Sequence, residues 1–122
     1  GIDRAAAERV LDGRPAGFVF LGLAAFLDDA TLARALDAMY DAAPAGSRLV
    51  FDFDAMELAS YPAALEMMGP AFHMREPERF ADLLGRWVPT GDGVVPVARW
   101  RPDGAPEAVP DAFWGGIAEK AA

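Results

Sequence analysis

The segment Phe18-Val19-Phe20-Leu21-Gly22-Leu23 constrains the fold of this chain more than any other. A strand buried on one face alternates apolar and polar residues, whereas this run has no polar member. Such runs are typical of parallel sheets, in which helices cover both faces. The run therefore predicts a strand over Gly17–Leu23 from the interior of an α/β sheet.

The 122 residues predict one α/β domain, residues 1–122, with about four mixed strands and flanking helices. Strands are expected at Gly17–Leu23, Ser47–Asp54, Val94–Trp100 and Ala112–Lys120, and helices at Asp3–Leu11, from Asp28 or Asp29 to about Ala43, from about Met56 to Met68, and from Pro77. The first two strands are joined through a helix and should be parallel, while the last two should form an antiparallel hairpin. Pro96 cannot donate to a strand ladder, which places its strand at an edge.

The expected strand order is Gly17–Leu23, Ser47–Asp54, Ala112–Lys120, Val94–Trp100, which leaves the most apolar strand at the other edge. A long apolar edge promotes association. The residues before Phe18 read as one helix, so they hold no strand and Gly-rich turn of the kind that grips a nucleotide-like cofactor. We therefore expect another segment to pair along Phe18–Leu23. It would be an amino-terminal half of the same fold or a second chain, as in a homodimer.

Composition disfavours several classes of function. The absence of cysteine excludes disulfides and thiolate metal sites, and a single histidine makes no convincing metal site. A net charge of −8 argues against a nucleic-acid partner. The apolar runs are shorter than the roughly 20 residues that a membrane span needs, and no signal peptide is evident. A cytoplasmic protein is the expectation.

Several motifs match one family. They are Arg14-Pro15-Ala16-Gly17, Leu23-Ala24-Ala25-Phe26, Pro44-Ala45-Gly46-Ser47, Arg75-Glu76-Pro77-Glu78 with Leu84-Gly85, and the long, specific block from Asp92 to Pro102, Asp-Gly-Val-Val-Pro-Val-Ala-Arg-Trp-Arg-Pro. Together they resemble the actinobacterial family of Rossmann-like S-adenosylmethionine-dependent methyltransferases first catalogued as a domain of unknown function. The resemblance covers nearly all of this chain but only the latter half of the family's domain.

The resemblance implies S-adenosylmethionine as cofactor, bound only with a complementing amino-terminal half. The implied cofactor contacts are Asp3, Gly22, Leu23 and Phe26. The family's first three strands have no counterpart here, and Ala25 replaces the histidine of the family's Leu-His-Phe. The chain is thus expected to contribute the acceptor-substrate side of a methyltransferase site.

His73 and Asp54 are the candidate catalytic residues. Methyl transfer from a sulfonium needs in-line alignment and, for some acceptors, removal of a proton. Asp52 and Asp54 should face the same side of their strand, with Asp54 nearer the carboxyl end where ligands bind. His73 lies in a segment expected to be partly buried. Solvated strand-end carboxylates and a structural, hydrogen-bonded histidine are the alternatives.

The candidate substrate contacts are Asp28, Met56, Tyr61, Met68 and Phe72. The segment from Met56 to Met74 is rich in methionine, and in related methyltransferases this Met-rich segment forms a lid over the acceptor. Adaptable methionines suit a variable apolar ligand. The same methionines also suit a core or a dimer face, and Asp28 is equally explained as a helix N-cap.

Two other functions stay open. One is a non-catalytic methyltransferase-like scaffold or dimerisation domain in a biosynthetic assembly. The other is a small-ligand binding domain that uses the Met-rich segment.

Overall fold

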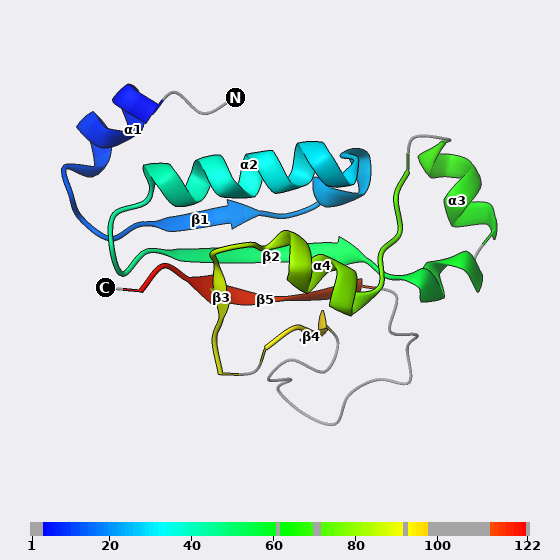
Figure 1. Ribbon diagram of the computed structural model, residues 1–122. Helices are drawn as coiled ribbons and strands as arrows, with labels where there is room; N and C mark the ends of the chain where they lie inside the picture. Colours follow the sequence, from blue (N-terminus) through cyan, green and yellow to red (C-terminus); the bar gives the residue numbers. More distant parts are fainter. Residues whose placement is uncertain (1–3, 61, 70–71, 92, 98–112, 122) are drawn as a thin grey trace.

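A computed structural model describes residues 4–60, 62–69, 72–91, 93–97 and 113–121. The elements are α1 (Arg4–Leu11), β1 (Gly17–Phe20), a 3₁₀ helix (Ala24–Phe26), α2 (Asp29–Ala42), β2 (Arg48–Asp54), a second 3₁₀ helix (Met56–Ser60), α3 (Pro62–Met68), α4 (Pro77–Leu83), β3 (Val88–Pro89), β4 (Val95–Pro96) and β5 (Phe113–Glu119) (Figure 1). Within these ranges, no helix has both the length and the apolar character needed to cross a bilayer.

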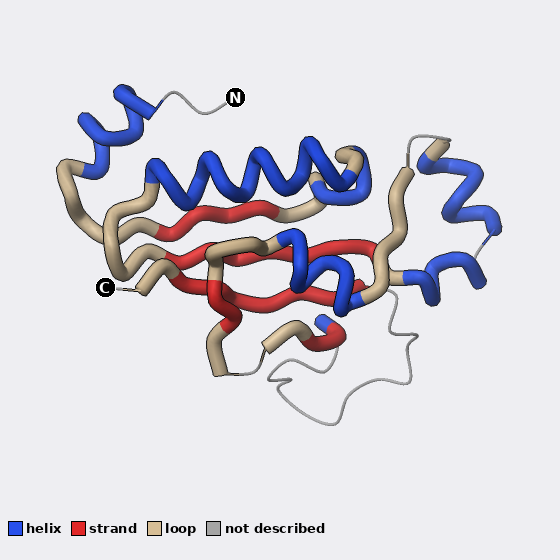
Figure 2. Tube along the Cα trace, viewed as in Figure 1, coloured by secondary structure: helices blue, strands red, loops and turns tan. Residues whose placement is uncertain are grey.

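Five strands form one mixed sheet in the order β1-β2-β5-β3, with β4 also paired to β5 (Figure 2). β1 and β2 are parallel, while β5 is antiparallel to β2, β3 and β4. The predicted α/β class, strand order, parallel pair and antiparallel hairpin are therefore confirmed. The expected count of about four strands was one too low, because Val88–Pro89 pairs with the end of β5. A strand of two residues is too short to show a period in the sequence.

The first strand is shorter than the predicted Gly17–Leu23. It ends at Phe20, and Gly22 then adopts a φ of +70°, a conformation that glycine takes at little cost. The amide of Gly22 donates a hydrogen bond to Asp52 Oδ1 at 2.8 Å, which fixes this turn against β2. The predicted strand Val94–Trp100 appears as β4, and its residues 98–100 lie outside the described ranges.

The core lies on one face of the sheet, where α2 and α4 pack (Figure 1). Alternate residues of β2 are buried against these helices, Arg48 is exposed, and the remaining positions are half-buried. Phe80 of α4 is fully buried, with its ring centroid 5.2 Å from that of Phe51 and 4.3 Å from that of Phe53. From α2, Leu32 and Leu36 fill the other side of this core.

The opposite face of β1 and β2 is more open. Val19 is 69% exposed and Leu21 is 49% exposed, while Val50, Asp52 and Asp54 are half-buried. The expectation that the first strand is buried on both faces is therefore not met by the described residues. Those residues also supply no second strand beside β1, so the expected pairing along Phe18–Leu23 stays a prediction.

Replacing Gly116 by alanine should destabilise the sheet. A Cβ atom there would lie 2.5 Å from the carbonyl oxygen of Gly93 and 3.1 Å from Cζ of Phe51. We expect Gly116→Ala to lower the free energy of unfolding by about 1–3 kcal/mol, the usual cost of overpacking. Urea denaturation followed by tryptophan fluorescence measures this loss. Gly91→Ala is the matched control, because a Cβ at Gly91 meets no atom within 4 Å. Equal stability of the two variants would contradict the close approach of Gly93 and Phe51 to Gly116.

Candidate functional site

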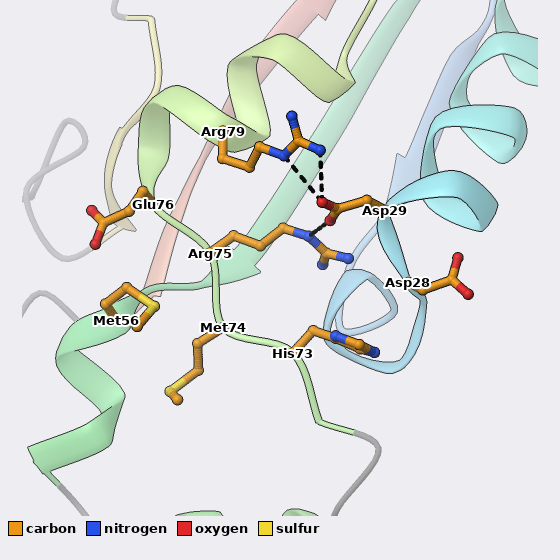
Figure 3. Close-up of a pocket in the computed structure, with 8 residues that line it drawn as sticks. All are labelled: Asp28, Asp29, Met56, His73, Met74, Arg75, Glu76 and Arg79. Atoms are coloured by element: carbon orange, nitrogen blue, oxygen red, sulfur yellow. Dashed lines mark hydrogen bonds and ion pairs between the residues drawn. The ribbon is translucent and has the colours of Figure 1, made fainter.

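An open pocket of about 510 Å³ lies near the carboxyl ends of the parallel strands β1 and β2 (Figure 3). Open α/β sheets bind their ligands at this end of the strands. Three parts of the chain line it: the turn into α2, Met56 after β2, and the segment that leads into α4 together with the first turn of α4. The lining residues are Asp28, Asp29, Met56, His73, Met74, Arg75, Glu76 and Arg79.

Arg75 joins these segments. Its side chain is 4% exposed. Its Nη1 donates to the carbonyl of Ala24 at 2.7 Å, and its Nη2 donates to the carbonyl of Leu27. Its main-chain amide donates to the carbonyl of Asp54 at 2.9 Å, at the end of β2. Arg75 therefore holds the turn after β1 through its buried guanidinium and the end of β2 through its main-chain amide.

Asp29 balances the charge of Arg75. Arg75 Nε donates to Asp29 Oδ1 at 2.9 Å, while Arg79 donates from Nε and Nη2 to Asp29 Oδ2 at 3.0 and 2.9 Å (Figure 3). The hydrogen bonds from Arg75, and then those from Arg79, hold the pKa of Asp29 below its usual value. The ionised form of Asp29 is therefore favoured, and both of its carboxylate oxygens accept hydrogen bonds from arginine.

Asp28 caps α2. Its Oδ1 accepts a hydrogen bond from the amide of Thr31 at 2.7 Å, as the N-cap interpretation predicts. This hydrogen bond is the largest cause of the lowered pKa of Asp28, and the nearby charges of Arg34 and His73 add to it. The cap is confirmed, and a substrate contact through Asp28 stays a prediction.

His73 itself is exposed, whereas Phe72 and Met74 on either side of it are half-buried, so the segment is partly buried as expected but the histidine is not. Its main-chain amide donates to the carbonyl of Ala25 at 2.7 Å, and its ring lies on the Asp28 side of the pocket (Figure 3). The backbone contact fixes the position of the residue and leaves the imidazole at the pocket surface.

Asp54, the other candidate catalytic residue, is not among the residues that line this pocket. It is half-buried and lies on the same face of β2 as Asp52, as predicted from their spacing. Burial raises the pKa of Asp54, and the charge of Asp52 raises it further. Asp54 is therefore a stronger proton acceptor than an ordinary carboxylate.

The candidate cofactor contacts surround the end of β1. Gly22 forms the turn, and the side chains of Leu23 and Phe26 are 51% and 53% exposed. Phe26 packs edge-to-face on Phe72, with ring centroids 6.1 Å apart, so this candidate substrate residue is a neighbour of the turn. Asp3 lies outside the described residues.

Among the other substrate candidates, Met56 lines the pocket and is 43% exposed. Tyr61 lies outside the described residues, and Met68 is placed in α3 by its backbone alone. Across the described residues, no three histidine or carboxylate side chains are grouped as a metal ion would require.

Arg75 and Arg79 were missed as site residues. Arg75 was recognised only as part of a family motif, with no role for its side chain. The available signal was a pair of arginines four residues apart at a helix start, opposite an acidic residue in the first turn of another helix. Such a signal indicates an ion pair but not burial.

Comparison with known proteins gives both a family and a fold. A family model described as S-adenosyl methyltransferase matches residues 2–121. A putative methyltransferase from Thermobifida fusca has a solved structure with 24% identity and a TM-score of 0.74, covering 99% of this chain and 53% of that one. No curated protein matches the chain.

Two further solved structures share the fold. A protein of the DUF574 family from Streptomyces avermitilis has 18% identity and a TM-score of 0.72, covering 98% of this chain and 53% of that one. The pyocyanin biosynthetic protein PhzM has 20% identity and a TM-score of 0.55, covering 99% of this chain and 40% of that one. This chain therefore spans about half the length of the two structures that resemble it with the higher TM-scores.

Removing the guanidinium of Arg75 should lower the stability of the folded chain. Arg75→Met leaves the carbonyls of Ala24 and Leu27 without their donor and removes a partner of Asp29. We expect the free energy of unfolding to fall by about 2–4 kcal/mol. The matched control is Arg86→Met, which removes ion pairs to Asp37 and Asp41 from a side chain that is 48% exposed. Its cost should be clearly smaller than that of Arg75→Met, because exposed ion pairs are screened by solvent. Urea denaturation that ranks the two variants equally would refute the role of Arg75.

The stability of the chain should depend on pH through Asp29. Because the folded state lowers its pKa, Asp29 contributes stability above the usual carboxyl value of 3.8, and this contribution is lost as the pH falls through the folded value. Asp29→Asn should therefore be less stable than the wild type at pH 7, with the difference shrinking toward pH 3. Urea midpoints at both pH values measure it. Asp54→Asn should behave in the opposite way, with a gain at pH 7 that shrinks in acid, because the folded state raises the pKa of Asp54.

Proposed function

The chain belongs to the S-adenosyl methyltransferase family, and we propose that it is the carboxyl-terminal portion of such an enzyme, one that contributes the acceptor side of the active site. The family resemblance seen in the motifs is confirmed by this match. One observation carries the proposal. The family match extends over nearly the whole chain, yet this chain covers only 53% of each of the Thermobifida fusca and Streptomyces avermitilis structures, and β1 stands at an edge of the described sheet.

S-adenosylmethionine is the cofactor of this family. When bound, it supplies an electrophilic methyl group on a sulfonium. The described residues fit one side of it: Leu23 and Phe26 expose apolar surface at the end of β1, suited to an adenine ring. The 122 residues contain no Gly-x-Gly-x-x-Gly sequence for the rest of the molecule. An amino-terminal complement that pairs along Phe18–Leu23 would supply that part.

The pocket fits the acceptor. Met56 and Met74 give it an apolar wall, while Asp28 and Glu76 give it carboxylates. An acceptor with an apolar body and a proton-bearing polar atom suits this lining. His73 is placed at the surface of the pocket to take that proton, and Arg75 acts as a positioning residue by holding the turn on which the acceptor would rest.

Asp54 is the second candidate base. Its raised pKa favours proton transfer near neutral pH, although the residue lies on the open face of β2 and not in the pocket wall. An acceptor that reaches from the pocket toward that face would bring its polar atom to Asp54. The two candidate bases are distinguished by measuring turnover of His73→Gln and Asp54→Asn in a complemented enzyme. The variant that loses turnover identifies the base.

Calorimetric titration of S-adenosylmethionine tests the proposal. The chain alone should bind the cofactor with a Kd weaker than about 1 mM, since it offers one side of the site. A chimaera should bind it with a Kd in the micromolar range. In this chimaera, the amino-terminal part of the Thermobifida fusca structure, upstream of its match, is joined to Gly1.

Two outcomes would overturn the proposal. Micromolar binding by the chain alone would show that no complement is needed. A chimaera with a cooperative unfolding transition that still binds no cofactor would favour the scaffold or dimerisation interpretation.

A further inference from the structure

The charges that line the pocket do not balance. Its two arginines face three carboxylates, which leaves one negative charge in excess while His73 is neutral. Two of the carboxylates have partners: Asp29 accepts hydrogen bonds from both arginines, and Asp28 accepts one from the amide of Thr31. The third belongs to Glu76, which is exposed and makes no cap hydrogen bond to α4.

The carboxylate of Glu76 has no partner among the described residues. Arg79 lies three residues further along the same helix, but both of its bonded nitrogens donate to Asp29 (Figure 3). Arg75 likewise directs its guanidinium to Asp29 and to main-chain carbonyls. Glu76 is therefore the carboxylate of this pocket that is left for a ligand to neutralise.

Glu76 and His73 mark two ends of the pocket. In Figure 3 the carboxylate of Glu76 lies on the side of Met56, whereas the ring of His73 lies on the side of Asp28. Met74 lies between them, and the three residues from His73 to Glu76 span at most about 11 Å of chain. The pocket thus has an acidic end, an apolar middle and an end with an imidazole, over the length of a small molecule.

We propose that the acceptor carries a protonated amine that pairs with Glu76, an apolar body that contacts Met56 and Met74, and a reacting polar atom directed toward His73. The inference rests on the proposed function, because it takes this pocket as the acceptor site, and it adds the charge class of the acceptor. Glu76 is then a specificity-determining residue.

The amine is the recognised group and not the methylated atom. A protonated amine has no lone pair with which to accept a methyl group, so the reacting atom has to be a different one. An anionic acceptor would meet the excess negative charge of the pocket, and like charges brought together lower affinity. The exposed position of Glu76 makes its effect one of selectivity more than of tight binding.

Three probes with similar apolar bodies test the charge preference of the chain. At neutral pH, 2-phenylethylamine carries a cation, 2-phenylethanol no charge and 3-phenylpropionate an anion. Their Kd values are measured by NMR from the methyl signals of ¹³C-labelled methionine. The signals of Met56 and Met74, assigned with Met→Leu variants, should shift, while that of Met39, buried in the core, should not.

The amine should bind with the lowest Kd and the anion with the highest. We expect the Kd of the amine to lie in the millimolar range, about two- to fivefold below that of the alcohol, the usual size of an exposed ion pair. Because solvent ions screen exposed charges, about 0.5 M salt should remove this difference.

Variants of Glu76 assign the preference to one carboxylate. Glu76→Gln should bind the amine and the alcohol equally, and Glu76→Arg should prefer the anion. Glu78→Gln is the matched control, because Glu78 is also an exposed carboxylate in the first turn of α4 but does not line the pocket. It should keep the wild-type preference. Circular dichroism and urea midpoints establish that each variant is folded.

The results separate this inference from the proposed function. Equal affinities of the wild-type chain for amine and alcohol, an amine preference that survives Glu76→Gln, or no shift of the Met56 and Met74 signals with any probe would overturn it, even if the chimaera binds S-adenosylmethionine. The expected pattern, combined with a chimaera that binds no cofactor, would support the cation-binding end of the pocket and reject its use in methyl transfer.

Discussion

The candidate site depends on the buried guanidinium of Arg75. A buried charge is tolerated when it is paired and fully hydrogen-bonded, and here one carboxylate and two main-chain carbonyls meet that condition. Because those carbonyls belong to the turn after β1, the charge can be satisfied only when the turn takes one conformation. The electrostatic requirement of a single side chain thereby fixes the shape of one pocket wall.

The two faces of the sheet are unequally covered, and this difference supports the proposal that the chain is part of a larger domain. On one face, stacked Phe51, Phe53 and Phe80 form a dense core with α2. On the other, Val19 and Leu21 keep about half or more of their surface in water. Soluble domains rarely leave adjacent strands so unevenly covered. The chain also covers only about half of the Streptomyces avermitilis and Thermobifida fusca structures, which agrees with this unequal cover.

Local patterns predicted the elements well, because they follow from residues close in sequence. The apolar run before Gly22 predicted β1, Pro96 predicted an edge strand, and Asp28 predicted a helix cap. The role of Arg75 could not be predicted in this way, because its carbonyl partners lie 48 and 51 residues earlier in the chain. The exposure of His73 was likewise missed, since its apolar neighbours indicated burial and the path of the backbone decided otherwise.

The place of β5 in the sheet has a consequence for synthesis. β5 follows the other four strands along the sequence, yet it lies between β2 and the short strands β3 and β4. None of those three can complete its ladder before the ribosome has released residues 113–119. A nascent chain would expose the free edge of β2 until residues 113–119 emerge, and contacts of such long sequence separation form slowly. Until β5 is in place, the edge of β2 therefore offers unpaired main-chain groups to non-native strand pairing.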